Sequence, residues 1–270
     1  MKPKISIIIS TKNEEKNIEN CLRSIKLQTI SPIEIIVVDN YSEDKTLNIA
    51  KKFTSKVYRK GPERSSQRNF GAVKATGDYV LFVDADMVLT PNVVMDCIKK
   101  ISNSRLKCIV IPEKSFGKSF WAKCKALERS YYVGVDWIEG ARFFDRKKFL
   151  ELGGYNRLLV SGEDWDLHSR FTQNSKCGRI NNYILHNEGS LSLKDTVGKK
   201  YYYAKNIHRY KSVSNQSQYA AQASVIKRYK LFLASPKKLV SNPIIGLGML
   251  FMKFCEYGAG FLGYIVGGLK

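Results

Sequence analysis

Two aspartates, Asp84 and Asp86, follow an apolar run at residues 79–83 with one alanine between them. In an extended chain alternate side chains point to the same face, so we expect the two carboxylates about 7 Å apart. Carboxylates this close repel unless a cation lies between them or each has its own partner. Mg²⁺ and Mn²⁺ prefer carboxylate and phosphate oxygens. The pair therefore predicts a divalent metal that also holds a diphosphate; the structural alternative is a turn cap at Asp84 beside a solvated Asp86.

Polar side chains also follow two other apolar runs, at residues 5–10 and 34–38. Ligands of open α/β sheets bind beyond the carboxyl ends of the strands, so these side chains are expected at one edge of a sheet. The residues concerned are Thr11, Lys12, Asn13 and Glu14 after the first run, and Asp39 and Asn40 after the second.

The elements that would position these residues alternate along the chain. Short, continuous, β-branched runs predict buried strands of a parallel sheet, at residues 5–10, 34–40, 79–86 and 107–112. Helical periodicity predicts helices between and after them, at residues 14–29, 44–53, 65–75, 118–133 and 163–171. Residues 141–149 are expected to be a strand that leads into a helix. The alternation predicts a doubly wound, mostly parallel α/β sheet with helices on both faces.

Composition narrows the class of protein. The chain has 270 residues, 44% of them hydrophobic, which is enough for a globular domain with a real core. Its net charge of +21 favours nucleic acid, an anionic membrane or a phosphorylated substrate as partner. The six cysteines form no C-x-x-C motif, so we expect a reducing cytosolic setting. The first ten residues lack the apolar core of a signal peptide.

The C-terminal third differs in character. Residues 194–211 are basic and aromatic, and residues 244–269 are almost entirely apolar apart from Lys253 and Glu256. Three segments are expected: a catalytic domain at 1–193, a basic helical region at 194–243 and an apolar segment at 244–270. The two mid-segment charges and seven glycines favour an interfacial or re-entrant segment over a full membrane span. A helix packed on the catalytic domain is the soluble alternative.

Four segments in order resemble the successive motifs of the family 2 glycosyltransferases of the GT-A fold, of the membrane-associated type. They are "SIIISTKNEEKNIENCLRSI", "IIVVDNYSEDKT", "QRNFGAVKATGDYVLFVDADM" and "GEDWDLHSR". The resemblance runs from about residue 4 to about residue 190. It implies a Rossmann-like catalytic domain that transfers a sugar, with inversion, from a UDP- or GDP-sugar, using Mn²⁺ or Mg²⁺.

The resemblance also implies roles for individual residues. Asp86 would ligate the metal, with His186 in "LHNEG" as a second ligand or else a partly buried histidine that is hydrogen-bonded to the backbone. Asp164 in "GED" matches the general base, where a helix cap is the alternative. Arg142 would touch diphosphate or acceptor, or lie on the surface. The residues that would bind the nucleotide-sugar are Thr11, Asn13, Glu14, Asp39, Arg68, Asn69 and Asp84. Lys12 stands where the family often has a base-stacking tyrosine.

The acceptor is inferred from chemistry. A phosphate acceptor is already anionic, whereas a hydroxyl needs a base. The "GED" match therefore favours a hydroxyl of a lipid-linked glycan or glycolipid. The basic region before an apolar segment suits an anionic leaflet, and predicts a peripheral or monotopic enzyme on the cytoplasmic face of the cell membrane.

Other functions stay open at this point. One is a glycosyltransferase for a polysaccharide or polyprenyl-phosphate acceptor. A second is a basic nucleic-acid-binding protein, although the acids at the strand ends argue against it and we expect no nucleic-acid partner. A third is a nucleotidyltransferase, which would carry a glycine-rich basic loop where this chain has Glu14 and Glu15. An inactive scaffold has no positive support.

Overall fold

The computed structural model describes residues 3–102 and 104–269. The chain forms two compact units, which are described separately. Unit 1 comprises Met1–Glu113, Gly140–Arg157 and Leu167–His186, and unit 2 comprises Lys114–Glu139, Leu158–Asp166 and Asn187–Lys270. The units interleave along the sequence, whereas the three segments expected from composition follow one another. That functional division stays a prediction.

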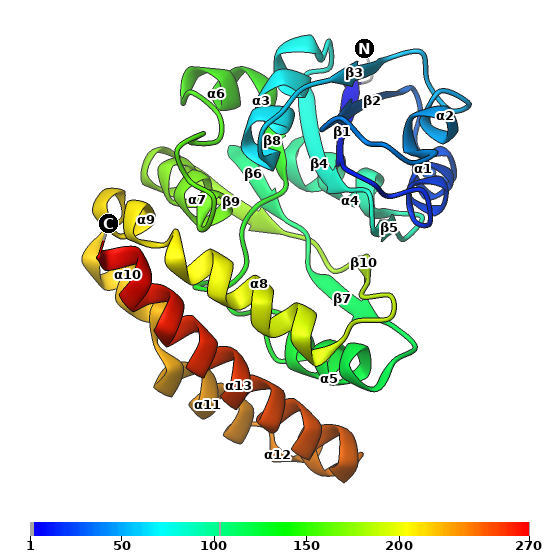
Figure 1. Cartoon of the computed structure of the whole chain (residues 1–270). Helices are drawn as coiled ribbons and strands as arrows, with labels where there is room; N and C mark the ends of the chain where they lie inside the picture. Colours follow the sequence, from blue (N-terminus) through cyan, green and yellow to red (C-terminus); the bar gives the residue numbers. More distant parts are fainter. Residues whose placement is uncertain (1–2, 103, 270) are drawn as a thin grey trace. The chain divides into compact units, whose positions relative to one another are not determined.

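Unit 1 is built on a seven-stranded sheet of order β3-β2-β1-β4-β8-β6-β9 (Figure 1). The strands are β1 (Ile5–Thr11), β2 (Ile33–Asp39), β3 (Val57–Arg59), β4 (Tyr79–Asp84), β6 (Leu106–Val110), β8 (Phe143–Asp145) and β9 (Lys176–Arg179). β8 is antiparallel to both its neighbours, and the other pairs are parallel. The mostly parallel sheet and its four predicted strands are confirmed.

Helices cover both faces of this sheet (Figure 1). Every residue of β1 is buried, and its alternate side chains enter different cores: Ile7 and Ile9 belong to one apolar cluster and Ile8 to the other. The helices predicted in this unit are confirmed: α1 (Ile18–Lys26) and α2 (Thr46–Ala50) are shorter than predicted, α3 (Arg64–Lys74) is shifted by one residue, and α7 (Glu163–Asn174) runs further than predicted. α6 (Arg146–Glu151) follows the predicted strand, and α4 (Val93–Ser102) was not predicted.

A second sheet has three short strands in the order β5-β10-β7. They are β5 (Met87–Leu89), β7 (Glu113–Phe116) and β10 (Ile184–Asn187). β5 and β10 are antiparallel, and their register sets His186 opposite Met87. Strands of three or four residues are too short for a periodic signal, so the sequence pattern does not predict β5 or β7.

Unit 2 is helical. Its helices are α5 (Phe120–Ser130), α8 (Leu193–Lys205), α9 (His208–Val213), α10 (Gln216–Ala223), α11 (Val225–Leu233), α12 (Pro236–Val240) and α13 (Pro243–Gly268). α13 lies alongside α8 and also packs on α5 (Figure 1). It is one continuous helix of 26 residues rather than the turned-back chain of a re-entrant segment. By length and composition α13 could cross a membrane, and a third (33%) of its most apolar window is buried within the protein.

The glycines of α13 have a packing role. A Cβ at Gly263 would lie 2.4 Å from the carbonyl oxygen of Tyr201, and one at Gly267 would lie 2.1 Å from that of Lys205. These two positions, four residues apart, lie on the face that approaches the backbone of α8. From the sequence, the glycines are expected to weaken the helix. In the structure, several of them instead allow a close approach to a neighbouring backbone that a larger residue would prevent.

The two charges within α13 also face its neighbours. Lys253 Nζ lies 2.7 Å from Glu128 Oε1 and 2.5 Å from Glu256 Oε2. Lys125 on α5 pairs with both Glu128 and Glu256, at 2.8 and 3.1 Å, and Thr196 on α8 donates to Glu256. Burial raises the pKa of Glu128, but the charges of Lys125 and Lys253 outweigh it and hold the pKa well below its usual value. The charges therefore join α13 to α5 and α8.

Candidate active site

Three parallel strands of unit 1 end together. The register pairs Thr11 of β1 with Asp39 of β2, and Ser10 of β1 with Asp84 of β4. The predicted gathering of polar residues at one edge of the sheet is therefore confirmed. Asp86 follows two residues after Asp84, in the turn between β4 and β5. The edge is where ligands of open α/β sheets bind.

Arginine side chains surround Asp84. Its Oδ1 lies 2.9 Å from Arg68 Nη2 and accepts a hydrogen bond of 3.0 Å from Ser10 Oγ. Its Oδ2 lies 3.6 Å from Arg142 Nη1. Burial raises the pKa of Asp84, but the charges of Arg68, Arg142 and Arg64 outweigh it and lower the pKa well below its ordinary range. Asp84 is therefore ionised and already neutralised by protein groups.

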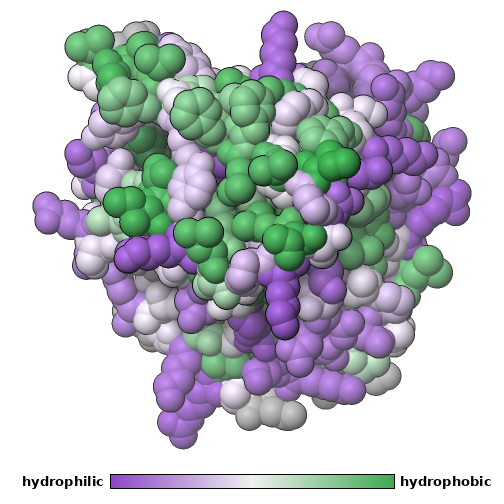
Figure 2. All heavy atoms as spheres, turned by 90° about the horizontal axis from the view of Figure 1, so that it is seen from below, coloured by the Kyte–Doolittle hydropathy of each residue, from purple (hydrophilic) through white to green (hydrophobic). Residues whose placement is uncertain are grey.

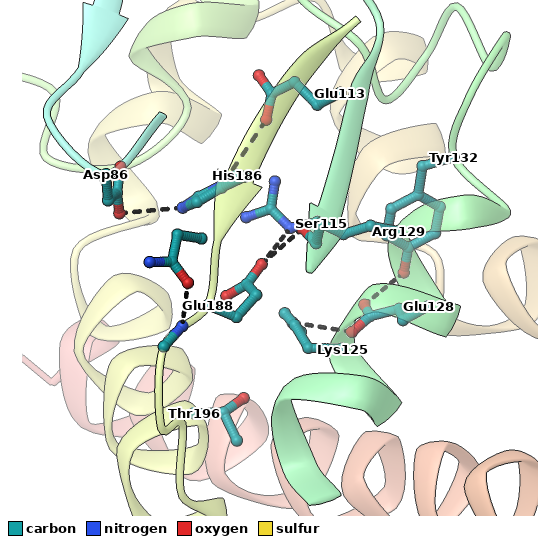
Figure 3. Close-up of polar contacts among 12 residues, drawn as sticks. Asp86, Glu113, Ser115, Lys125, Glu128, Arg129, Tyr132, His186, Glu188 and Thr196 are labelled. Atoms are coloured by element: carbon teal, nitrogen blue, oxygen red, sulfur yellow. Dashed lines mark hydrogen bonds and ion pairs between the residues drawn. The ribbon is translucent and has the colours of Figure 1, made fainter. Parts of the chain in front are cut away.

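Asp86 has a different partner. Its Oδ2 lies 3.0 Å from Nε2 of His186, which β10 brings beside β5 (Figure 3). Its other oxygen, Oδ1, is buried, and no group among residues 3–102 and 104–269 hydrogen-bonds to it. Carboxylate oxygen and neutral imidazole nitrogen are both ligands that Mn²⁺ accepts. The free oxygen and this donor pair fit a divalent cation, held by Asp86 and His186.

Glu113 contacts both the arginine beside Asp84 and the histidine beside Asp86. Its Oε1 accepts a hydrogen bond of 2.5 Å from Arg142 Nε. Its Oε2 lies 3.9 Å from His186 Nδ1 (Figure 3). Glu113 thus orients the arginine that faces Asp84 and the histidine that faces Asp86. Glu113 is not predictable from the sequence, because a single acid after the strand at 107–112 carries no pattern of its own.

The first two strand ends are connected by hydrogen bonds. The Asp39 carboxylate accepts from the Ser42 backbone at 2.9 Å and from the Ser42 hydroxyl at 2.5 Å. Ser42 in turn accepts from the Asn13 backbone at 2.8 Å. Asn13 has a φ of 53°, in the left-handed region that asparagine tolerates. The loops that carry Asn13 and Asp39 therefore hold each other in place.

Thr11 and Glu14 complete this edge. The Thr11 Oγ1 atom is buried, and no partner for it occurs in the described part of the chain. The backbone N–H of Glu14 donates to Thr46 at 2.8 Å, and its carboxylate accepts from Asn17 at 2.7 Å. Gln67, which the sequence analysis does not single out, donates to the carbonyls of Thr11 and Val38 at 2.9 and 2.6 Å.

Asn69 is engaged elsewhere in unit 1. Its amide donates to the Tyr155 carbonyl at 2.7 Å and accepts from the Tyr155 backbone at 2.8 Å. The ring of Tyr155 lies 5.1 Å from the Arg68 guanidinium. Asn69 thus fixes the segment that supports Arg68, and its contact with a nucleotide-sugar stays a prediction.

Asp164 belongs to unit 2, in the first turn of α7, together with Glu163 and Asp166. The helix begins after Gly162, whose φ of 82° is in the left-handed region, where a Cβ would lie 2.6 Å from the ring of Tyr210. Trp165 donates from Nε1 to the Ile138 carbonyl at 2.8 Å. These contacts anchor the start of the helix, while the role of Asp164 as a base stays a prediction.

Comparison with known proteins was made on this basis. Residues 6–154, more than half the chain, match the sequence model of the family described as "Glycosyl transferase family 2". A GalNAc(5)-diNAcBac-PP-undecaprenol beta-1,3-glucosyltransferase of Campylobacter jejuni is 24% identical over 256 residues, 90% of this chain and 75% of that protein. Several other curated relatives match over 92–122 residues, which is 18–28% of their own length.

Two solved structures share the fold. The mannosyltransferase PcManGT of Pyrobaculum calidifontis, in complex with GDP-Man and Mn²⁺, has a TM-score of 0.64 at 13% identity, over 98% of this chain and 88% of that one. Residues 1–349 of TarS from S. aureus, in complex with UDP-GlcNAc, have a TM-score of 0.56 at 17% identity, over 97% and 89%. With the strand-end carboxylates and the family match, this likeness leads to one conclusion: the chain is a glycosyltransferase of family 2, with the GT-A fold.

Proposed function

We propose that the protein is a metal-dependent, inverting glycosyltransferase that moves a sugar from a UDP- or GDP-sugar to a hydroxyl of a lipid-linked glycan or glycolipid. The observation that supports this most is the 3.0 Å approach of His186 to Asp86, beside an Asp84 that arginines already neutralise. In such a site Asp86 would bind the cation, and Asp84 would accept hydrogen bonds from the sugar or the ribose.

The donor is proposed to bind along the edge formed by β1, β2 and β4. Thr11, with its buried hydroxyl, and Asp39 would contact the nucleoside, and Asp84 the ribose or sugar. The other residues proposed for this site are Asn13, Glu14, Arg68 and Asn69. A Mn²⁺ or Mg²⁺ ion bound to Asp86 and His186 would neutralise the charge that builds up on the departing nucleoside diphosphate.

The base is proposed to be Asp164. Attack on the anomeric carbon from the face opposite the leaving group needs a hydroxyl whose proton is taken by a nearby carboxylate. Asp164 lies in the first turn of α7 and is proposed to supply this carboxylate. An ionised carboxylate at neutral pH is what this step requires.

Membrane association is proposed from unit 2 and from a relative. The Campylobacter relative is named for an undecaprenol-linked substrate. Figure 2 shows a broad apolar area bordered by hydrophilic side chains on one face of the molecule. Exposed apolar residues of α13 are Ile244, Leu247, Phe251, Phe254, Phe261, Leu262 and Ile265. Exposed lysines of α11 and α12 are Lys227, Lys230, Lys237 and Lys238. Together these apolar residues and lysines suit a peripheral or monotopic protein on an anionic leaflet. We propose that this is the cytoplasmic leaflet of the cell membrane.

The donor is tested by the thermal stability of the detergent-solubilised chain. Binding to the native state raises Tm by mass action. We expect UDP or GDP, or one of their sugar conjugates, to raise Tm only with Mn²⁺ or Mg²⁺, and Asp86→Ala to abolish that shift. Asp78→Ala, at the opposite end of β4, is the matched control and keeps it. No shift with any nucleotide in folded protein would contradict the proposal.

The base and the acceptor are tested by turnover. Asp164→Asn should remove transfer to a hydroxyl acceptor while leaving the donor-dependent Tm shift in place, and Asp166→Asn is the control from the same helical turn. Transfer by Asp164→Asn to a polyprenyl phosphate at the wild-type rate would instead favour the alternative acceptor, which needs no base. Transfer of the sugar to a polysaccharide rather than to a lipid-linked glycan would favour the alternative of a polysaccharide acceptor.

A further inference from the structure

A second group of metal-ligating side chains lies in unit 1, away from Asp86 in the chain. It consists of Cys108 on β6, Cys177 on β9 and His168 on α7. The two sulfur atoms and an imidazole nitrogen all lie within 4.8 Å of one another. Cys177 Sγ is 4.0 Å from His168 Nδ1. This is the one group of three or more cysteine, histidine, aspartate or glutamate ligands of such spacing within residues 3–102 and 104–269.

The fold brings these residues together from three elements. Cys108 and Cys177 are direct partners in the parallel pair β6–β9, just after a register irregularity between Leu106 and Cys108. Residues paired in this way point to the same face of a sheet. Cys108 and Leu167, the residue before His168, belong to one apolar cluster, and Cys177 packs against it. β9 is the edge strand of the sheet, and Cys177 and His168 are only half-buried, so a cation can reach the group.

Cys177 differs in acidity from the buried thiols of unit 1. A hydrogen bond with Cys108 is the main cause that lowers the pKa of Cys177 to about 6, against the effect of burial and with help from His168. The pKa of Cys108 is raised by the same hydrogen bond and by burial. Burial raises the pKa of Cys21 and Cys97. Cys177 is thus the more acidic of the two thiols, and a cation could replace its proton.

We propose that Cys108, Cys177 and His168 form a binding site for a thiophilic cation, Zn²⁺ foremost, separate from the site at Asp86. Thiolate and imidazole are the ligands of Zn²⁺ and Cu⁺, whereas Mg²⁺ and Mn²⁺ prefer oxygen. Around a tetrahedral zinc ion, a sulfur ligand at about 2.3 Å and a nitrogen ligand at about 2.0 Å lie roughly 3.5 Å apart. Cys177 Sγ and His168 Nδ1 are 4.0 Å apart, and Nδ1 accepts a hydrogen bond of 3.3 Å from the Ala141 N–H. A bound cation would replace that hydrogen bond and draw the two atoms together by about 0.5 Å. Three protein ligands leave the fourth position for water.

Such a cation would connect α7 to β6 and β9. His168 lies four residues after Asp164 on the same helix, one turn along the same face. A bound cation would therefore hold the helix that carries the proposed base. The binding itself does not depend on the proposed function, and its test needs no glycosyl transfer.

The test uses the full chain, purified in detergent under reducing conditions, stripped with a chelator and titrated with Co²⁺ as a spectroscopic probe. We expect one equivalent of Co²⁺ with a sulfur-to-metal charge-transfer band and intense tetrahedral d–d bands, all displaced by Zn²⁺. Cys177→Ser and His168→Gln should lose these bands. Cys255→Ser, a half-buried thiol of unit 2, and Asp86→Ala should keep them. Absence of a sulfur band in the wild type, or its survival in Cys177→Ser, overturns the proposal.

A second measurement needs no variant. Zn²⁺ should slow the alkylation of Cys108 and Cys177 in the wild-type chain, followed by peptide mass spectrometry, and leave that of Cys255 unchanged. Equal alkylation rates with and without Zn²⁺ overturn the proposal. Recovery of a Cys108–Cys177 disulfide that persists under reductant with Zn²⁺ present also overturns it, because an oxidised pair has no thiolate to offer.

Discussion

Asp84 and Asp86 are tolerated two residues apart because each carboxylate has its own counter-group. Arg68 and Arg142 compensate Asp84, and His186 lies against Asp86. The arginines leave Asp84 little capacity for a second positive charge. Asp86, with a buried oxygen that no described group contacts, retains that capacity. At the residue scale the two acids are therefore not equivalent, and Asp86 is the one that we propose as the metal ligand.

The first prediction concerns the stability of the Asp84 pair. Asp84→Asn should destabilise the fold by about 3 kcal/mol at pH 7, because it removes the carboxylate charge that lies 2.9 Å from the buried Arg68 guanidinium. The folded-state pKa of Asp84 lies well below the unfolded value of about 4, so the extra stability is fully present above that pH and is lost progressively as the pH falls from there toward the folded-state pKa. Urea unfolding of both proteins at several pH values from about 3 to about 8, a range that includes the titration of an ordinary aspartate, measures the difference. A difference that grows on acidification would contradict this.

The second prediction concerns Glu113 as a positioning residue. Glu113→Gln keeps the shape but removes the charge that faces Arg142 and His186. Loss of such an outer partner typically costs about 10–100-fold in metal affinity, and we expect that loss for Mn²⁺ in the presence of nucleotide. Isothermal titration of Mn²⁺ measures it.

The control for Glu113 is Glu188→Gln. Glu188 lies two residues after His186, but it pairs with Ser115 at 2.7 Å and with Arg129 at 3.1 Å inside unit 2 (Figure 3). Its substitution should leave the Mn²⁺ affinity unchanged. Equal effects of the two substitutions would mean that Glu113 acts only through general stability.

At the element scale, α13 is defined by a face of glycines and paired charges and an opposite face of exposed apolar residues. Gly246, Gly260 and Gly263 are buried at helical spacing, and so are Lys253 and Glu256. A helix that is apolar all round would be buried or would span a membrane. α13 instead satisfies its charges against α5 and α8 and leaves Phe254 and Phe261 exposed. Such a division suits a helix at an interface better than one alone in a bilayer.

The third prediction compares two glycines of this helix. Gly263→Ala places a Cβ against the Tyr201 carbonyl and should destabilise the protein by about 1–3 kcal/mol. Gly258→Ala meets nothing within 4 Å and should stabilise it by about 0.5–1 kcal/mol, because alanine favours the helix. Denaturant unfolding of the two variants in detergent gives both values. The same sign for both would mean that α13 does not approach α8 as closely as described.

At the scale of the whole molecule, charge and apolar surface act together. The net charge of +21 attracts the protein to any anionic surface, and salt screens that attraction. Apolar side chains of unit 2 would then add a contribution that salt does not remove. The two contributions can be separated experimentally.

The fourth prediction is binding to vesicles. Anionic phospholipid vesicles should bind the protein more tightly than neutral ones, and added salt should reduce the difference. Phe254→Glu should weaken binding to both. Leu27→Glu in unit 1 is the matched control, since Leu27 and Phe254 are both 72% exposed, and it should change little. Equal loss in the two variants would indicate a purely electrostatic association with no preferred face. Sedimentation of the vesicles with the bound protein gives the measurement.

Much of the fold could be predicted because its signals are local. The runs at β1, β2, β4 and β6 are apolar and continuous, and a parallel strand buried on both faces requires that pattern. The helices α1, α3 and α7 show their periodicity within one segment. β5 and β7 were not predicted because three or four residues carry no periodic signal, and because their common neighbour, β10, lies far along the chain.

The amino-acid sequence by itself determined the strand ends, since an acid placed after a buried strand of a parallel sheet must emerge at its carboxyl edge. It also determined the family, through motifs in a fixed order. Only the tertiary structure decided which groups face one another: Arg142 and Glu113 beside the two aspartates, His168 beside Cys108 and Cys177, and the glycines of α13 against α8. The physical reason is range. Backbone pattern is set by neighbours a few residues away, whereas the pairing of charges, thiols and close backbone contacts depends on segments that meet only when the chain has folded.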